Sequence, residues 1–329
     1  HDAAHPAGLR LAPEPAMRWA ELLDRPAGGV SPCERPAPRP PAGARPDRIS
    51  ATEVETLIAD PYAFYAKRVL RLRPLEPLDA EVGAADYGNL VHAAMAGFVR
   101  RLGAVWPGRG AAEACFIDAA EAALREAGAH SGLAAFWRPR LRRIGAFAVA
   151  QEAALRENGG VARSHTEVRG ELELRRPDGR TVSLTARADR IDLRADGAFA
   201  ILDYKTGTLP SGKAVQEGHK PQLLLEAAMA AQGCFEGLEA GDTGELTYWR
   251  LTGGPEPGEV RTAMRDARAI DAAAAHAMER LHALADRFLF GQAPFTARPH
   301  AGRAPAGGDY DHLSRLAEWS GAEDAEPAA

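Results

Sequence analysis

Long hydrophobic runs, clustered cysteines and an excess of positive charge are all missing from this sequence of 329 residues. No stretch of about 18 apolar residues occurs, so we expect no membrane-spanning helix. The three cysteines, Cys33, Cys115 and Cys234, lie far apart without metal-ligand spacing, which favours a reducing, cytoplasmic location. The net charge of −5 argues against a uniformly basic, non-specific nucleic-acid binder, although it leaves room for a local basic groove.

Lysine is also scarce, because only four of the 40 basic residues are lysines. A lysine in a chemically suggestive position is therefore informative in this chain. An amine is a compact point charge that can lose its proton, whereas a guanidinium cannot. Lys205 is such a case, since it stands two residues after Asp203.

Composition divides the chain into three parts. Residues 1–46 are rich in Pro, Ala and Arg and predict an extended linker with polyproline character. This part begins without Met or a signal pattern, so we expect it to be cut from a longer chain. Residues 47–300 carry the patterns of a folded domain, and residues 301–329 read as a tail with a short helix over 309–319.

Hydrophobic periodicity predicts the elements of the folded part. Helices are expected over 62–69, 86–102, 113–127, 137–158, 216–231 and 264–290, and strands over 166–175, 182–193, 199–205 and 245–251. Ser50 and Glu53 form a capping box that opens a further short helix, and Asp60 before Pro61 is a helix start. Helices, then a strand meander, then helix, strand and helix predict an α/β fold with a mixed sheet.

The most informative stretch joins two of these strands. Asp196-Gly197, between two apolar runs, predicts a hairpin turn. Asp203 and Lys205 lie two apart on the second strand and leave the same face, which Asp189 on the partner strand can reach. Metal-assisted phosphodiester hydrolysis needs such a set, because carboxylates hold divalent cations and an amine can stabilise developing charge.

Each of these residues also has a plainer interpretation. Alternating charges from Asp189 to Asp192 usually mark a solvated strand face. A single helical histidine such as His92 is more often a core or surface residue, and Gln222 can be a surface amide. A solvated face does not explain why Asp203 directly follows a buried run, so the chemical interpretation is favoured for the set.

A second motif, at residues 207–214, resembles a phosphate-binding loop. Its last position is Ala214, which cannot hold magnesium as Ser or Thr would, and Pro210 removes a backbone donor. We therefore interpret Lys213 in this motif as a surface lysine, and an ATP site as a decoy.

Taken in order, the motifs resemble the RecB-like branch of the PD-(D/E)xK nucleases, and within it the AddB-type nuclease domains of alphaproteobacteria. The similar segments lie at 50–55, 60–66, 88–92, 188–192, 203–207, 221–227 and 248–251. Each segment is weak alone, and the ordered set is specific. The resemblance implies a restriction-endonuclease-like core, with a mixed central sheet flanked by helices and additional N-terminal helices.

The resemblance also implies roles for single residues. It implies metal ligation by His92, Asp189, Asp203 and the carbonyl of Tyr204. It implies catalytic roles for Asp189, Asp203, Lys205 as the catalytic lysine, and Gln222 as the glutamine of a Q-x-x-x-Y motif. Glu167 matches an acidic position ahead of the hairpin. Oxygen ligands suit magnesium, and the histidine slightly favours manganese.

Two departures from the family pattern stand out. Glu226 occupies the place of the motif's tyrosine, so a stacking or hydroxyl role is not expected there. Many AddB-type domains carry four cysteines that bind an iron–sulfur cluster. This chain has Asp60 at the first of those places and no cysteine after Cys234, so we expect no iron–sulfur cluster.

These implications predict a magnesium-dependent deoxyribonuclease, an exonuclease domain of a helicase–nuclease subunit that acts in double-strand break repair and recombination. The expected partners are broken DNA ends, with a single strand in the nuclease site, and an AddA-type helicase–nuclease subunit in a heterodimer. The alternative is a non-catalytic DNA-binding or scaffold subunit with a degenerate site. The presence of Asp189, Asp203 and Lys205 argues against that alternative.

Overall fold

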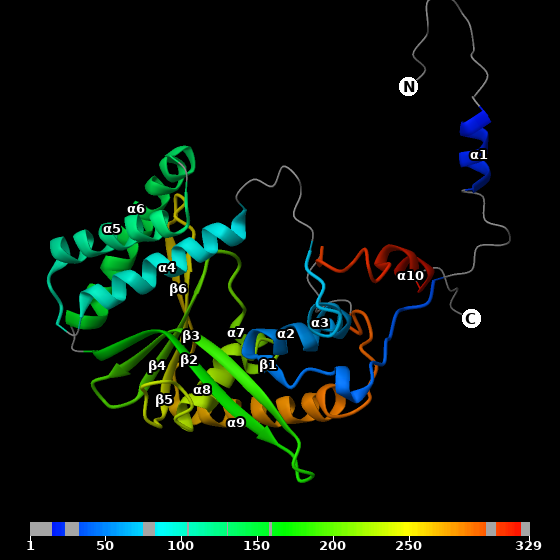
Figure 1. Cartoon of the computed structure of the whole chain (residues 1–329). Helices are drawn as coiled ribbons and strands as arrows, with labels where there is room; N and C mark the ends of the chain where they lie inside the picture. Colours follow the sequence, from blue (N-terminus) through cyan, green and yellow to red (C-terminus); the bar gives the residue numbers. More distant parts are fainter. Residues whose placement is uncertain are drawn as a thin grey trace, which may run out of the picture. The chain divides into compact units, whose positions relative to one another are not determined.

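The predicted hairpin forms the centre of one mixed sheet in the computed structural model of the chain (Figure 1). The described strands of this sheet are β1 (Arg48–Ser50), β2 (Val161–Arg175), β3 (Thr181–Arg194), β4 (Phe199–Lys205), β5 (Thr243–Leu251) and β6 (Gly258–Met264). β2 pairs antiparallel with β3 along its whole length, so β1 and β4 share the other edge of β3. β4 continues to β5 in parallel, and β5 pairs antiparallel with β6.

The structure describes residues 15–23, 33–74, 83–103, 105–129, 131–157, 160–300 and 307–323. The chain separates into two compact units. One comprises residues 1–35 with 311–329 and contains α1 (Pro15–Leu23) and α10 (Leu316–Glu323). The other, Pro36–Tyr310, contains the sheet and the remaining helices.

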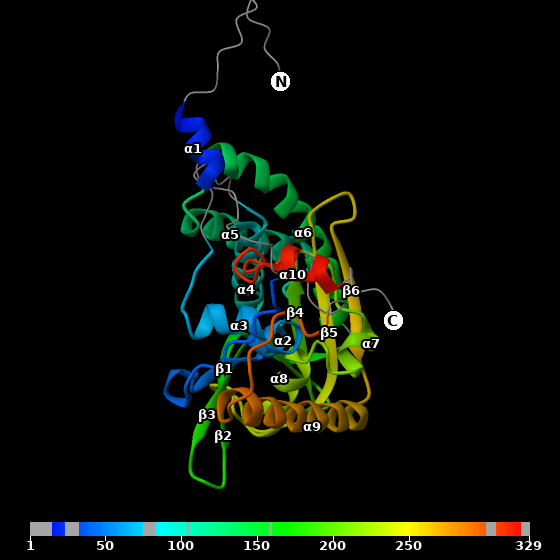
Figure 2. The same cartoon turned by 90° about the vertical axis from the view of Figure 1, so that its right-hand side faces the viewer.

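Helices cover both faces of the sheet. They are α2 (Ala51–Ala59), α3 (Pro61–Arg68), α4 (Ala84–Leu102), α5 (Arg109–Glu126), α6 (Ser131–Glu157), α7 (Gly212–Gln216), α8 (Gln222–Ala231) and α9 (Ala267–Leu284), with a short 3-10 turn η1 (Ala42–Ala44) and a π-helical end η2 (Ala285–Leu289). Helices α4, α5 and α6 pack on one face, and α8 and α9 pack on the other, as Figures 1 and 2 show. None of the described helices combines the length and apolar composition that a bilayer crossing requires.

Each face of the sheet has its own hydrophobic core. Alternate residues of β4 divide between them, because Phe199 and Ile201 enter the core under α8 and α9, whereas Leu202 and Tyr204 enter the core under α4, α5 and α6. This alternation confirms a strand buried on both sides, as the apolar run before Asp203 predicts. The end of β4 therefore delivers its polar residues to the boundary between the two layers.

Local signals explain most of the helix boundaries. The capping box at the start of α2 is formed, with the Glu53 N–H donating to Ser50 Oγ at 3.2 Å and the Ser50 N–H donating to Glu53 Oε2 at 3.1 Å. Asp60 caps α3 by accepting from two backbone N–H groups. Both features are confirmed, and together they fix the helix pair that follows β1.

Several predicted boundaries are wrong for identifiable reasons. The helix expected over 216–231 begins only at Gln222, because α7 ends at Gln216 and Gly218, with φ of +66°, turns the chain before α8. The helix expected from 264 begins at Ala267, since β6 occupies the residues before it and Asp266 is the N-cap. In the proline-rich N-terminal stretch, where polyproline backbone is predicted, α1 is a helix that places Pro15 at its first position.

A buried ion network connects the helical layer to the sheet. Arg190 of β3 is fully buried, donates to both carboxylate oxygens of Glu152 on α6, and donates from Nε to Asp192 at 2.7 Å. Arg156, one turn after Glu152, donates to the same carboxylate at 2.8 Å. The opposing charges hold the pKa of Arg190 well above its usual value despite burial. This network aligns α6 with β3 directly beside Asp189.

Glu152→Ala tests the network. The change leaves the buried Arg190 without its main partner, so the free energy of unfolding should fall by about 3–5 kcal/mol in urea denaturation. The matched control is Glu121→Ala, which removes a partly exposed pair with Arg138 and should cost less than about 1 kcal/mol. Equal losses in the two variants would contradict a structural role for the network.

Candidate active site

A cleft of about 1290 Å³ opens between α4 and the sheet. Its lining includes the acidic and polar side chains that the sequence singles out. They are His92 from α4, Glu167 from β2, Asp189 from β3, Asp203 and Lys205 from β4, and Gln222 and Glu226 from α8. Five elements from distant parts of the chain therefore supply one site.

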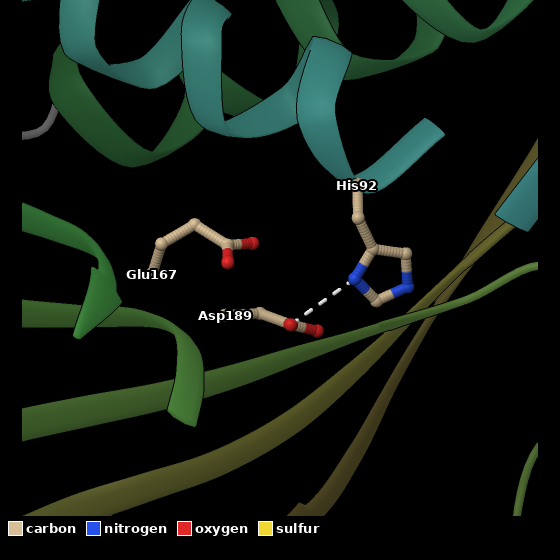
Figure 3. Close-up of side chains that lie close together, drawn as sticks. All are labelled: His92, Glu167 and Asp189. Atoms are coloured by element: carbon tan, nitrogen blue, oxygen red, sulfur yellow. Dashed lines mark hydrogen bonds and ion pairs between the residues drawn. The ribbon is translucent and has the colours of Figure 1, made fainter. Parts of the chain in front are cut away.

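Three of these side chains form a compact set of candidate metal ligands. One atom each of His92, Glu167 and Asp189 lies within 4.8 Å of the others, and Figure 3 shows the three side chains converging from α4 and two strands. His92 Nδ1 lies 3.1 Å from Asp189 Oδ1. Burial lowers the pKa of His92, but the hydrogen bond and charge of Asp189 outweigh it and raise the pKa. The set offers one imidazole nitrogen and two carboxylates, which suits a divalent cation.

The backbone is strained at one of these ligands. Glu167 has φ of +55°, in the left-handed region that residues other than glycine rarely adopt. It lies opposite Asp189, because the pairs on either side are Thr166 with Arg190 and Val168 with Ala188. Strain of this kind costs about 1–3 kcal/mol, and facing like charges add to it. A cation held between the two carboxylates would offset both costs.

The partner strand is irregular at the same place. Ala188 and Ile191 enter the same hydrophobic core although they are three residues apart, so the strict alternation of β3 breaks between them. The break allows Arg190 to point into the α6 layer while Asp189 faces His92. The irregularity in β3 and the strain in β2 therefore position the ligand set together.

Asp203 forms the second half of the site. Its carboxylate is 2% exposed, lies 2.9 Å from Lys205 Nζ, and accepts a hydrogen bond from Gln222 Nε2 at 2.8 Å. Burial raises the pKa of Asp203 to about 6, although the charge of Lys205 acts in the opposite direction. Burial also lowers the pKa of Lys205, but the charge of Asp203 outweighs it, so the pKa of Lys205 is raised. Lys205 is thus a cation beside a carboxylate that binds a proton easily.

Glu226 is a buried acid in this centre. It accepts from Gln222 Nε2 at 3.2 Å and is 1% exposed. Burial, and then the charge of Asp203, raise its pKa well above the usual range. A buried carboxyl group that is hydrogen-bonded to Gln222 therefore stands in place of the motif's tyrosine.

The cluster of candidate ligands overlaps with the predicted ligand set. His92 and Asp189 come together as expected, but the third member among the described residues is Glu167 rather than Asp203. Tyr204 contacts the site through its backbone N–H, which donates to Asp189 Oδ2 at 2.8 Å. The sequence contained a signal for Glu167, since counting back from the Asp178-Gly179 turn places residue 167 opposite residue 189.

A family model described as the PD-(D/E)XK nuclease superfamily matches residues 48–303, which include the whole site. The chain belongs to this superfamily. Its mixed sheet flanked by helices agrees with the predicted fold class. Nucleases of the superfamily use divalent metals and act on DNA, which is consistent with the donor set of His92, Glu167 and Asp189.

Proteins similar to this chain occur in Rickettsia. An uncharacterized protein of Rickettsia bellii is 29% identical over 195 residues, and one of Rickettsia conorii is 30% identical over 196 residues. Each match covers 58% of this chain but 22% and 23% of the respective relative, so the chain spans less than a quarter of the relatives' length. A solved structure, "Crystal structure of SSO0001", is 17% identical with 58% and 73% coverage, and its TM-score of 0.25 is too low to establish a common fold.

Glu167→Gly separates strain from metal binding. Glycine adopts a positive φ without strain. Without metal, the free energy of unfolding of the variant should therefore be about 1 kcal/mol higher than that of the unaltered protein. The same variant loses a ligand, so the rise in Tm on adding Mn²⁺ or Mg²⁺ should shrink. Thermal denaturation with and without each cation measures both effects.

The matched control is Glu167→Gln, which keeps the strained backbone and removes the charge. It should weaken the metal-induced rise in Tm without the gain that comes from relieving φ. An unchanged metal response in both variants would show that Glu167 is not a ligand.

Proposed function

We propose that this nuclease is a Mg²⁺- or Mn²⁺-dependent deoxyribonuclease domain that cuts DNA as an exonuclease. The observation that carries the proposal is the placement of a three-residue ligand set in one cleft with the Lys205–Asp203 pair. A bound cation would lower the pKa of a water molecule and neutralise charge on the phosphate. The protein would supply the ligands, a cation for the developing charge, and a cleft that holds the strand.

Each residue of the site has a part in this proposal. His92, Asp189 and Asp203 hold the metal, as the family resemblance implies, together with the Tyr204 carbonyl, and Glu167 joins them. Lys205 stays protonated and stabilises the charge that develops on the phosphate. Gln222 orients the carboxylate of Asp203, because its amide donates to Asp203 and to Glu226 at the same time.

The wider role follows from the ordered motifs. We assign the domain, over residues 47–300, to an AddB-type subunit that works with an AddA-type helicase–nuclease partner on broken DNA ends in recombinational repair. The segments at 188–192 and 203–207 support the assignment. The presence of Asp189, Asp203 and Lys205 in one cleft argues against a degenerate, non-catalytic domain.

Replacing Lys205 tests the chemistry. Lys205→Ala leaves the carboxylates in place, so DNA should still bind, while cleavage of linear DNA with Mg²⁺ and no ATP should slow by roughly a hundredfold or more. Lys205→Arg should restore little of the cleavage rate, because a guanidinium is larger than an ammonium group and planar. Rates on linear DNA, with binding measured in Ca²⁺, separate the two effects.

Lys213→Ala is the matched control, because Lys213 lies in the decoy loop with a side chain that is 82% exposed. It should cleave at the rate of the unaltered protein. An inactive Lys213→Ala beside an active Lys205→Ala would refute the nuclease proposal.

Metal binding should depend on pH. Since the pKa of Asp203 is raised to about 6, protons compete with the cation for this carboxylate on the acid side of neutrality. Affinity for Mn²⁺ should therefore rise between about pH 5 and about pH 7.5, with proton release on binding at the lower pH. Calorimetry in buffers of different ionisation enthalpy measures both.

Asp203→Asn removes the titrating group at nearly constant shape. It should bind Mn²⁺ more weakly at neutral pH, with a smaller change across the same pH interval. If the variant keeps the full pH dependence, Asp203 is not the group that binds the proton, and the ligand assignment of Asp203 fails.

A further inference from the structure

A second cleft, of about 1230 Å³, adjoins the candidate active site at β1. Arg48 of β1 lines the active-site cleft, and the residues just before it line the second cleft. Arg68 lines the second cleft and donates to the Arg48 carbonyl at 3.1 Å, so the two clefts share a boundary. A chain-like ligand could pass from one to the other over this boundary.

The second cleft is basic. Its charged lining consists of Arg45, Lys67, Arg68, Arg71 and Arg73 against Asp47 and Asp309. We call this surface the basic cleft. Its local excess of positive charge contrasts with the net charge of −5 of the whole chain. The site is therefore built for an anionic ligand, although the chain as a whole repels one.

The cationic side chains are not equivalent. Arg45 is structural, because its buried guanidinium donates to the carbonyl oxygens of Phe288 and Ala293. Lys67 lies 3.6 Å from the Glu53 carboxylate. Arg71 and Arg73 are exposed, and within the described ranges no acidic side chain pairs with either of them. Their charges are available to a ligand.

A fixed backbone presents these two arginines. The Leu72 N–H donates to Ala66 at 3.0 Å, and the Leu72 carbonyl accepts from the Tyr310 hydroxyl at 2.8 Å. Arg71 has φ of +57°, a conformation that costs a residue other than glycine about 1–3 kcal/mol and persists where the surroundings enforce it. The segment after α3 is thus held in place by hydrogen bonds in spite of strain at Arg71.

An aromatic ring completes the lining. Tyr310 is half-buried in the basic cleft, and its hydroxyl is anchored by Leu72. Cationic grooves with fixed aromatic rings bind single-stranded nucleic acid, since the cations follow the phosphates and unpaired bases stack on the ring. Bases of a duplex are already stacked and paired, so the ring favours a single strand.

We propose that the basic cleft binds the sugar–phosphate backbone of a DNA single strand that extends from the active-site cleft over β1. This inference rests on the proposed function, which supplies the DNA. Arg71 and Arg73 contact successive phosphates, and Tyr310 stacks on a base. The basic cleft makes long strands bind more tightly than short ones and leaves the chemistry at the metal centre unchanged.

Charge reversal in the full chain tests the proposal. In Arg71→Glu/Arg73→Glu, affinity for a single strand of about 20 nucleotides, measured in Ca²⁺, should fall at least tenfold. The slope of log affinity against log salt should decrease by about 1.4, or about 0.7 for each lost phosphate contact. Binding and Mg²⁺-dependent cleavage of a strand of about four nucleotides, which the active-site cleft can hold alone, should stay within about twofold.

Arg109→Glu/Arg268→Glu is the matched control. Both residues are exposed, lie outside the two clefts, and give the same change in net charge. The control should lose much less affinity for the long strand. Equal losses in the two double variants would show a general charge effect and overturn the proposal, as would an unchanged affinity in Arg71→Glu/Arg73→Glu.

A second variant tests whether misfolding causes the loss of affinity. Arg71→Gly/Arg73→Ala relieves the positive φ, so it should fold at least as well as the parent and still lose long-strand affinity. A loss confined to blunt duplex DNA would overturn the single-strand assignment. If the parent chain does not cleave the short strand, the proposed nuclease function fails. If it does, and neither double variant changes the affinity for the long strand, only the proposal for the basic cleft fails.

Discussion

The buried contact of Arg190 with Glu152 is the interaction on which the arrangement of this domain depends. It joins α6 of the helical layer to β3 of the sheet in a largely apolar surrounding, alongside other polar contacts such as that of Arg156 with Ser164 of β2. Apolar contacts are tolerant of sliding, whereas a desolvated ion pair loses most of its stabilisation when its geometry changes. His92 comes from the same helical layer and Asp189 precedes Arg190 on β3, so the ion pair lies beside the contact between these two candidate metal ligands.

Strain and charge are concentrated around that centre. Glu167 has an unfavourable backbone angle, Asp203 and Glu226 are buried acids with raised pKa values, and Lys205 is the nearby cation. The backbone strain and the burial of the two acids oppose the stability of the metal-free fold, and the Lys205–Asp203 ion pair offsets part of this cost. These features are the expected signs of a site organised for a ligand, since strained residues and perturbed pKa values gather where function requires them.

Sequence patterns predict the strands better than they predict the site. β3 and β4 follow from alternation and the Asp196-Gly197 turn, and His92 from the ordered motifs. β6 was missed because it is an edge strand whose residues are only partly buried, so its apolar alternation is weak. Glu167 was assigned no firm role because nothing in a glutamate signals a positive φ. The basic cleft could not be foreseen, since residues near 45, near 70 and at 310 meet only in the folded chain.

The place of β1 in the sheet has a consequence for the order of assembly. Arg48 pairs with Ser183, so β1 stays unpaired during synthesis until more than a hundred further residues have been made. Contacts of such long sequence separation close late, because the intervening loop must first lose its entropy. β1 forms the boundary shared by the two clefts, so the path between them exists only once this late contact has formed. A chain interrupted before residue 183 therefore has α2 and α3 but lacks the strand against which they are positioned.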